Sequence, residues 1–336
     1  MTWRGFGSDN HSGVHPEVLS AIAKANEGHA HPYGDDPWTA AAHDTLRRHL
    51  GKECDIAFVF NGTGANCVSF GVACKPWESV ICPTSAHINC DECGAPERVA
   101  GVKLVPVDTP DGKLTADLVA PHLSVLGFEH AAQPKIISVS NVSELGTVYT
   151  PAELRALADF AHAHGLLLHV DGARIANACA ALGCTMRELV TDSGVDLFSL
   201  GGTKNGMLAG EAVVLLGDAR SADLKYVRKQ LTQLSSKQRF IAAQFSAMFE
   251  GDLWLESARH ANAMAARLAQ GARNKGIELA QEPQANEIFA ILPAERIAPL
   301  VERFHFYVWD EPAGIVRWVT SWDTTADDVD VLVGAL

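Results

Sequence analysis

Residues 166–174 (LLLHVDGAR) decide the fold. The leading leucines begin an apolar run that continues to Val170, as in a strand buried on both faces of an α/β sheet. His169 and Asp171 are two positions apart, so on a strand they point to the same face. The apolar run ends at Asp171, and Gly172 breaks the pattern. An isolated aspartate here would more often cap the next helix, but the run also predicts a carboxylate at the sheet edge where open α/β folds bind ligands.

A lysine follows the next predicted buried strand. Residues 195–200 (VDLFSL) lead into a turn at 201–206 (GGTKNG) that contains Lys204. A Walker-type phosphate loop is excluded, because Lys204 is followed by Asn205 and not by serine or threonine. A lysine in a glycine-rich turn, beside a carboxylate at a sheet edge, indicates instead an imine to an aldehyde cofactor.

The two motifs together, HVDGAR at 169–174 and SLGGTKNG at 199–206, resemble those of the low-specificity L-threonine aldolases. These are pyridoxal 5'-phosphate (PLP) enzymes of fold type I, and the family includes phenylserine aldolase-like members. The resemblance extends from Ser8 to about Arg317. It implies an α/β fold, with a mostly parallel seven-stranded sheet, helices on both faces and a smaller α+β C-terminal domain. It also implies cleavage of β-hydroxy-α-amino acids, such as L-threonine and L-allo-threonine, to glycine and an aldehyde, and the reverse addition.

The resemblance assigns cofactor roles to several residues. Lys204 would carry PLP, Asp171 would pair with the pyridine nitrogen, and His87 would stack on the ring. Thr203 is expected to bind the cofactor beside Lys204. His87, or a water that it orients, is the candidate base for the substrate hydroxyl, and Glu92 is near enough in sequence to orient it. Many threonine aldolases carry a histidine in the loop after residues 135–140, where this chain has Ser143 or Glu144.

A second glycine-rich turn is a candidate phosphate site. Residues 56–60 (IAFVF) predict a strand, followed by Asn61-Gly62-Thr63-Gly64 and a helix. Glycines allow close approach of the backbone, and a helix N-terminus offers free N–H groups to a phosphate. The pattern is not the dinucleotide fingerprint, and a plain strand–helix connection is the alternative. Lys237 is a further candidate for the phosphate, in its own subunit or across a dimer interface, although a solvated lysine is the more usual meaning of such a charge.

Four residues are expected to bind the substrate. Arg317 shares a strand face with apolar neighbours, which is unusual for a charge without a partner, and arginine binds carboxylates through two parallel hydrogen bonds. The resemblance makes Arg317 and Ser8 the carboxylate anchors. The alternatives are an edge-strand arginine paired with a local acid and a solvated loop serine. Arg174 is placed to contact the phenolic oxygen of PLP or the substrate carboxylate. Tyr33 corresponds to a tyrosine that reaches into a neighbouring subunit's site, so we expect a homo-oligomer, either a dimer or a tetramer.

Composition limits the remaining possibilities. The chain has 336 residues, 47% of them apolar, and a formal net charge of −13, which argues against nucleic acid and anionic membranes as partners. We expect no signal peptide, no membrane span and a cytoplasmic location. The eight cysteines are scattered. His87, Cys90 and Cys93 have metal-ligand spacing, but a fourth ligand is missing, so we predict no metal site.

The predicted organisation is an N-terminal arm (1–14), a large PLP-binding α/β domain (15–250) and a small α+β domain (251–336). Two other functions remain open from the residues alone. One is a β-eliminating lyase or aminotransferase of the same fold. The other is a PLP-binding protein without catalytic activity.

Overall fold

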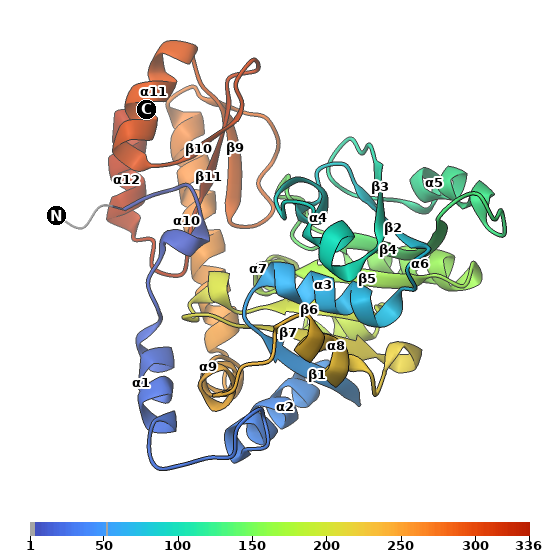
Figure 1. Cartoon of the computed structure of the whole chain (residues 1–336). Coiled ribbons are helices and arrows are strands. Elements are labelled where there is room, and N and C mark those ends of the chain that lie inside the picture. The colour runs from blue at the N-terminus through green and yellow to red at the C-terminus, as the bar shows by residue number, and fades with distance from the viewer. Residues whose placement is uncertain (1–3, 52) are drawn as a thin grey trace.

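The computed structural model describes residues 4–51 and 53–336 (Figure 1). A seven-stranded sheet, in the order β1-β7-β6-β5-β4-β2-β3, forms its centre. Its strands are β1 (Cys54–Val59), β2 (Glu78–Pro83), β3 (Lys103–Val107), β4 (Gln133–Ser140), β5 (Leu167–Gly172), β6 (Leu197–Gly201) and β7 (Glu211–Leu216). Strand β7 runs antiparallel to both neighbours, and all other pairs are parallel. The predicted mostly parallel sheet is confirmed.

Helices cover both faces of this sheet, because its strands are apolar on both sides. In β1, Ile56 and Phe58 enter one core cluster, whereas Ala57 and Val59 enter the other. The first cluster contains side chains from α1 (Pro16–Ala25), α2 (Pro37–Leu50), α6 (Pro151–Ala163), α7 (Ile175–Leu182) and α9 (Arg239–Phe249). The second contains α3 (Gly62–Ala73), α4 (His87–Cys90) and α8 (Leu224–Gln230). The short helix α5 (Ala116–Val119) follows β3.

A smaller antiparallel sheet, in the order β10-β11-β9-β8, lies beside the large one (Figure 1). It comprises β8 (Glu278–Leu279), β9 (Glu287–Ile291), β10 (Tyr307–Asp310) and β11 (Ile315–Val319), with α11 (Ala294–Phe304) and α12 (Ala326–Ala335). Helix α10 (Leu253–Asn274) contributes to both cores: Trp254 packs in the large one and Leu268 in the small one. The division at residues 14 and 250 stays a prediction. Across the described ranges, none of the helices is long and apolar enough to cross a membrane.

The N-terminal segment is tied to the small sheet by backbone hydrogen bonds. Phe6 donates its N–H to the Phe304 carbonyl and accepts a hydrogen bond from Val319 N–H, at 2.9 and 2.7 Å. The segment then forms the short 3-10 helix η1 (Asp9–His11). The residues expected to form a polar arm therefore bridge the two sheets.

Local signals located most helices and strands to within a few residues. The capping box at Thr150 is present, with Glu153 closing it and Pro151 in the first turn. The predicted helix 222–250, with a break near Ser235-Ser236, is two helices, α8 and α9, separated by residues 231–238.

The glycines of the two motifs permit close approach of the chain beyond β5 and β6. A Cβ atom on Gly172 would lie 2.4 Å from the Phe198 ring and 2.8 Å from the Ser199 carbonyl oxygen. A Cβ atom on Gly201 would lie 2.5 Å from the Ala173 carbonyl oxygen. Both positions meet backbone, which cannot rotate away, so a side chain at either would force the strand ends apart.

We predict that Gly172→Ala lowers the free energy of unfolding by roughly 1–3 kcal/mol, because the added methyl group overpacks the β5–β6 junction. Gly13→Ala is the control, since a Cβ atom there meets nothing within 4 Å. Chemical denaturation of both variants measures the difference. Equal stability of the two variants would contradict the close-packing account.

Candidate active site

One cavity of about 690 Å³ lies at the carboxyl ends of the parallel strands. Asp171, at the end of β5, lines it and is itself 8% exposed. Its Oδ2 accepts a hydrogen bond from Asn66 Nδ2 at 2.9 Å, and its Oδ1 accepts the Ala173 N–H at 3.0 Å. These bonds fix the carboxylate at the sheet edge and orient it by two independent donors.

Lys204 lines the same cavity and lies in the short 3-10 helix η5 (Thr203–Asn205), directly after β6. Strands β5 and β6 are neighbours in parallel register, with Asp171 opposite Ser199. Within the described part of the chain, the Lys204 amine makes no hydrogen bond or ion pair, so it is available to a ligand. The predicted pairing of an acid and an amine at one sheet edge is present.

Glu211 stabilises the turn that contains Lys204 by accepting hydrogen bonds from it. Its Oε2 accepts the Gly202 N–H at 2.6 Å, and Thr203 also donates to it. Burial raises the pKa of Glu211 from 4.5 to about 7, although these hydrogen bonds and the positive charge of Lys204 oppose the shift. The residue therefore titrates near neutral pH, inside the cavity that it lines.

The N-terminus of α3 opens onto the cavity through Gly62 and Thr63. The Asn61 side chain caps the helix by accepting the Gly64 N–H at 2.7 Å. A Cβ atom on Gly62 would meet nothing within 4 Å, so the backbone there is open to a ligand. Gly64 itself does not line the cavity, and its Cβ position is filled by the Gln233 side chain.

A buried hydrogen-bond chain links His87 to Asp171. His87 Nδ1 and Glu92 Oε1 are 2.9 Å apart, and Asn66 Nδ2 donates to the same Glu92 oxygen at 2.9 Å. Asn66 also accepts a hydrogen bond from Ser199 Oγ at 2.9 Å, and the chain continues to the fully buried His169. The hydrogen bond to Glu92 raises the pKa of His87. Glu92 is therefore buried against His87 and not solvated, and its role in orienting His87 stays a prediction.

The loop after β4 places Glu144, and not Ser143, in the cavity. Glu144 Oε1 accepts the His87 N–H at 2.8 Å and the Ser140 hydroxyl at 2.6 Å. Burial raises the pKa of its carboxyl group. Ser143 is buried and hydrogen-bonds Thr147, so it serves the loop itself.

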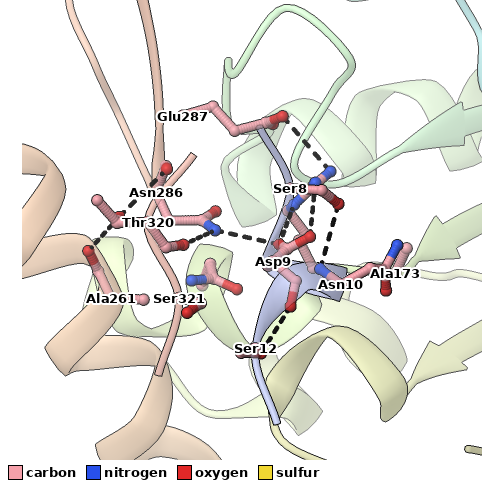
Figure 2. Close-up of polar contacts among 12 residues, drawn as sticks. Ser8, Asp9, Asn10, Ser12, Ala173, Ala261, Asn286, Glu287, Thr320 and Ser321 are labelled. Carbon is pink, nitrogen blue, oxygen red and sulfur yellow. Dashed lines mark hydrogen bonds and ion pairs between the residues drawn. The ribbon is translucent and has the colours of Figure 1, made fainter. Parts of the chain in front are cut away.

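Arg174 is held by a carboxylate from the N-terminal segment. Its Nε and Nη2 donate to the Asp9 carboxylate at 2.7 and 3.0 Å. Asn286 donates to Asp9 at 3.2 Å and to the Thr320 carbonyl at 2.8 Å, which ties this pair to the small sheet (Figure 2). Burial acts to raise the pKa of Asp9, but the charge of Arg174 and the hydrogen bonds outweigh it and lower that pKa.

Arg317 enters the cavity from β11, between aromatic rings. Its guanidinium lies 5.7 Å from the Tyr307 ring centre and 5.1 Å from that of Trp309. Arg317 Nη1 and Arg174 Nη1 both approach Oε1 of the buried Glu287, at 3.6 and 3.5 Å. Two arginines and two acids, Asp9 and Glu287, thus form one charge cluster at the cavity wall.

Nine of the twelve residues predicted for the site line this cavity: Ser8, Gly62, Thr63, His87, Asp171, Arg174, Thr203, Lys204 and Arg317. The other three, Gly64, Tyr33 and Lys237, do not. Tyr33 and Lys237 are exposed and near each other, since Tyr33 N–H donates to the Ser236 carbonyl at 2.9 Å.

Sequence reasoning missed four site residues, namely Asp9, Asn66, Glu211 and Glu287. Weak signals existed for some of them. Glu211 and Glu287 each open an apolar strand, where a carboxylate is unusual, and Asn66 interrupts an apolar helix. Asp9 gives no such signal, because its partner Arg174 is far away in the sequence.

The residues of the cavity fit PLP chemically. Asp171 offers a carboxylate to a pyridine nitrogen, and Lys204, which has no partner among the described residues, offers an amine to an aldehyde. The open backbone at Gly62 and Thr63, at the N-terminus of α3, can take a phosphate. A family whose description is Beta-eliminating lyase matches residues 5–295. The fold and the site define the chain as a PLP-dependent enzyme of fold type I.

Individual relatives indicate which members of this family the chain is most similar to in sequence and structure. The low specificity L-threonine aldolase of Pseudomonas aeruginosa is 41% identical over 98% of each chain, and that of Pseudomonas sp. strain NCIMB 10558 is 40% identical over 95% and 93%. The structure of Leishmania major threonine aldolase matches with a TM-score of 0.93 at 33% identity, over 98% of each chain. Sphingomonas wittichii serine palmitoyltransferase, at 18% identity and a TM-score of 0.73, shares the fold. The chain belongs to the Beta-eliminating lyase family, among its low specificity L-threonine aldolases.

Glu211 yields a prediction about stability and pH. Because the pKa of Glu211 is raised in the folded state, its contribution to the free energy of unfolding is fully present below pH 4.5. That contribution is lost as the pH rises through about 7. Glu211→Gln cannot ionise, so between pH 5 and pH 8 its free energy of unfolding should improve, relative to wild type, by roughly 2–3 kcal/mol. Denaturant titrations at both pH values measure this. A difference that does not change with pH would contradict the assignment.

Proposed function

We propose that this protein cleaves the Cα–Cβ bond of L-threonine, L-allo-threonine and other β-hydroxy-α-amino acids to glycine and an aldehyde, and catalyses the reverse addition. The observation that carries the proposal is the cavity itself. It brings together an acid, Asp171, an unpaired amine, Lys204, and a pair of arginines suited to a carboxylate. The names of its close relatives support the same reaction.

Bound PLP supplies an acceptor for the electron pair of the bond that breaks. Asp171 would keep a proton on the pyridine nitrogen, because its negative charge would favour the protonated form of that nitrogen. The Lys204 amine would hold the cofactor, with Thr203 beside it in the chain. Gly62 and Thr63 at the α3 N-terminus would hold the phosphate, with Gly64 set back behind them, and His87 would cover the ring.

The carboxylate of the amino acid binds Arg317 and Ser8, with Arg174 at the phenolic oxygen of PLP or at the same carboxylate. Fixing the carboxylate limits rotation of the substrate about its nitrogen. The orientation of the bound amino acid would then select the Cα–Cβ bond for cleavage. The arginines therefore decide which bond breaks, as well as how tightly substrate binds.

His87, or a water that it orients, accepts the proton of the β-hydroxyl group. An acceptor must be unprotonated, and the raised pKa of His87 means that this form becomes dominant at a higher pH than in an unperturbed histidine. Glu92 thus makes His87 a stronger base while shifting its working range to higher pH.

A second candidate function is β-elimination, because the matching family is described as Beta-eliminating lyase. The two reactions differ in products. Elimination gives a keto acid and ammonia, whereas the aldolase reaction gives glycine and an aldehyde. A transamination would require an acceptor keto acid. Product analysis with one β-hydroxy amino acid separates all three.

Tyr33 and Lys237 favour an assembly of identical subunits, in which each chain completes its neighbour's site. Both are exposed, and Tyr33 N–H bonds to the segment that carries Lys237. Lys229 lies 5.5 Å above the Tyr33 ring, so this surface is both aromatic and basic. A dimer or tetramer in the cytoplasm is the proposed state.

We expect the purified holoenzyme to release glycine from L-threonine and to absorb visible light through lysine-bound PLP. Lys204→Ala removes the only group proposed to carry the cofactor, so both the band and at least about 10³-fold of activity should be lost. Absorption spectra and glycine release measure this. Lys237→Ala should keep the band, because the amine that carries PLP is untouched. A band that persists in Lys204→Ala would contradict the proposal.

Glu92→Gln should move the acidic limb of the kcat/KM profile for L-threonine to lower pH. The variant removes the negative charge and weakens the acceptor that together raise the pKa of His87. Rate profiles from pH 5 to pH 9 measure the shift. An acidic limb that stays in place would assign the limiting proton to another group, such as Glu144.

A further inference from the structure

Glu287 is a buried carboxylate without a hydrogen bond. It opens β9, its side chain is 0% exposed, and neither Oε1 nor Oε2 has a hydrogen-bond partner among the described residues. An ionised carboxylate in such a place is unfavourable unless nearby charges compensate it. A purely structural acid would normally satisfy both oxygens, so this one requires another explanation.

Two guanidinium groups compensate it, and both belong to the cavity. Arg174 Nη1 and Arg317 Nη1 approach the same Oε1 at 3.5 and 3.6 Å. Arg174 follows β5 of the large sheet. Glu287 and Arg317 lie on β9 and β11, which are neighbouring strands of the small sheet. One buried anion therefore lies between two cations from different parts of the fold.

The other N–H groups of the two arginines differ in their hydrogen bonding. Arg174 donates hydrogen bonds from Nε and Nη2 to Asp9. Arg317 donates Nη2 to the Gly7 carbonyl at 3.3 Å, but its Nε is buried and has no partner in the described chain. The cluster holds an unsatisfied donor and unsatisfied acceptors together, which points to an incoming polar group.

Without Glu287, the two guanidinium groups would repel each other across a poorly hydrated wall. The carboxyl groups of Asp9 and Glu287 lie against the two guanidinium groups and give each of them a fixed direction. A carboxylate that enters the cavity then meets arginines that are already oriented, so less ordering is needed on binding.

We propose that Glu287 is a positioning residue for carboxylate recognition: it holds Arg174 and Arg317 in the orientation that binds the substrate carboxylate. This inference rests on the proposed function for the identity of the substrate. It goes beyond it by assigning a role to an acid that does not touch the reacting bond.

The test compares glycine with glycinamide, which lacks the carboxylate. Each is titrated into the PLP-loaded enzyme, and binding is followed by the change in visible absorption. In Glu287→Gln, glycine affinity should fall roughly 10- to 100-fold, because two charge-assisted contacts lose their geometry. Glycinamide affinity should change little. With L-threonine, KM should rise far more than kcat falls.

Asp196→Asn is the matched control, because Asp196 is a buried acid paired with His162 at 2.8 Å, and it does not line the cavity. It should alter neither affinity. If Glu287→Gln fails to fold, Asp9→Asn tests the same positioning from the other side of Arg174, with the same expected pattern. Thermal denaturation and PLP titration establish that each variant is folded and loaded.

Two results would overturn the inference. Equal loss for glycine and glycinamide, or no loss for either, would make Glu287 a structural tie between domains. Tighter glycine binding in Glu287→Gln would make Glu287 a competitor for the arginines and not their support. Neither outcome depends on aldol cleavage. A wild type that binds glycine selectively but does not cleave threonine would refute the proposed function alone.

Discussion

The parallel pairing of β5 with β6 is the constraint on which the site depends. It sets Asp171 opposite Ser199, and the chain beyond each strand then turns into the same cavity. The turn is possible only because Gly172 and Gly201 carry no side chain where backbone atoms approach within 3 Å of a Cβ position. The glycines that let the strand ends pack closely are therefore also needed to bring Asp171 and Lys204 to the same cavity.

Balanced charge is the second requirement, and it comes from distant parts of the chain. Several acidic side chains lie at the cavity wall, and buried carboxylates are unfavourable unless cations or hydrogen-bond donors pair with them. The Asn66 side-chain amide donates hydrogen bonds to both Asp171 and Glu92, and Arg174 forms an ion pair with Asp9. The N-terminal segment is consequently part of the site, because it delivers Asp9 to a residue that follows the central strand.

Sequence reasoning recovered what is local and missed what is paired at long range. Asp171 and Lys204 were predictable, since each ends an apolar run and the run itself predicts a strand. The same holds for the capping box at Thr150. Asp9 was not predictable, because its role lies in a contact with Arg174 that the topology creates. Glu287 gave only a weak signal, a carboxylate at the start of an apolar strand, and its role depends on the same arginine. Such a signal marks a buried charge but does not identify its partner.

The division of labour between the two sheets bears on specificity. The large sheet supplies Asp171 and Lys204, whereas the small sheet supplies Arg317 and the charge that steadies it. In the proposed function, Asp171 and Lys204 would hold PLP, and the arginines would bind the carboxylate that all α-amino acids share. Beyond them, the cavity is bounded by the exposed strand β10, where Tyr307 is 51% and Trp309 37% exposed. A wall that is open to solvent imposes weak selection on size, so recognition of the common part and tolerance of the β-substituent follow from the same architecture.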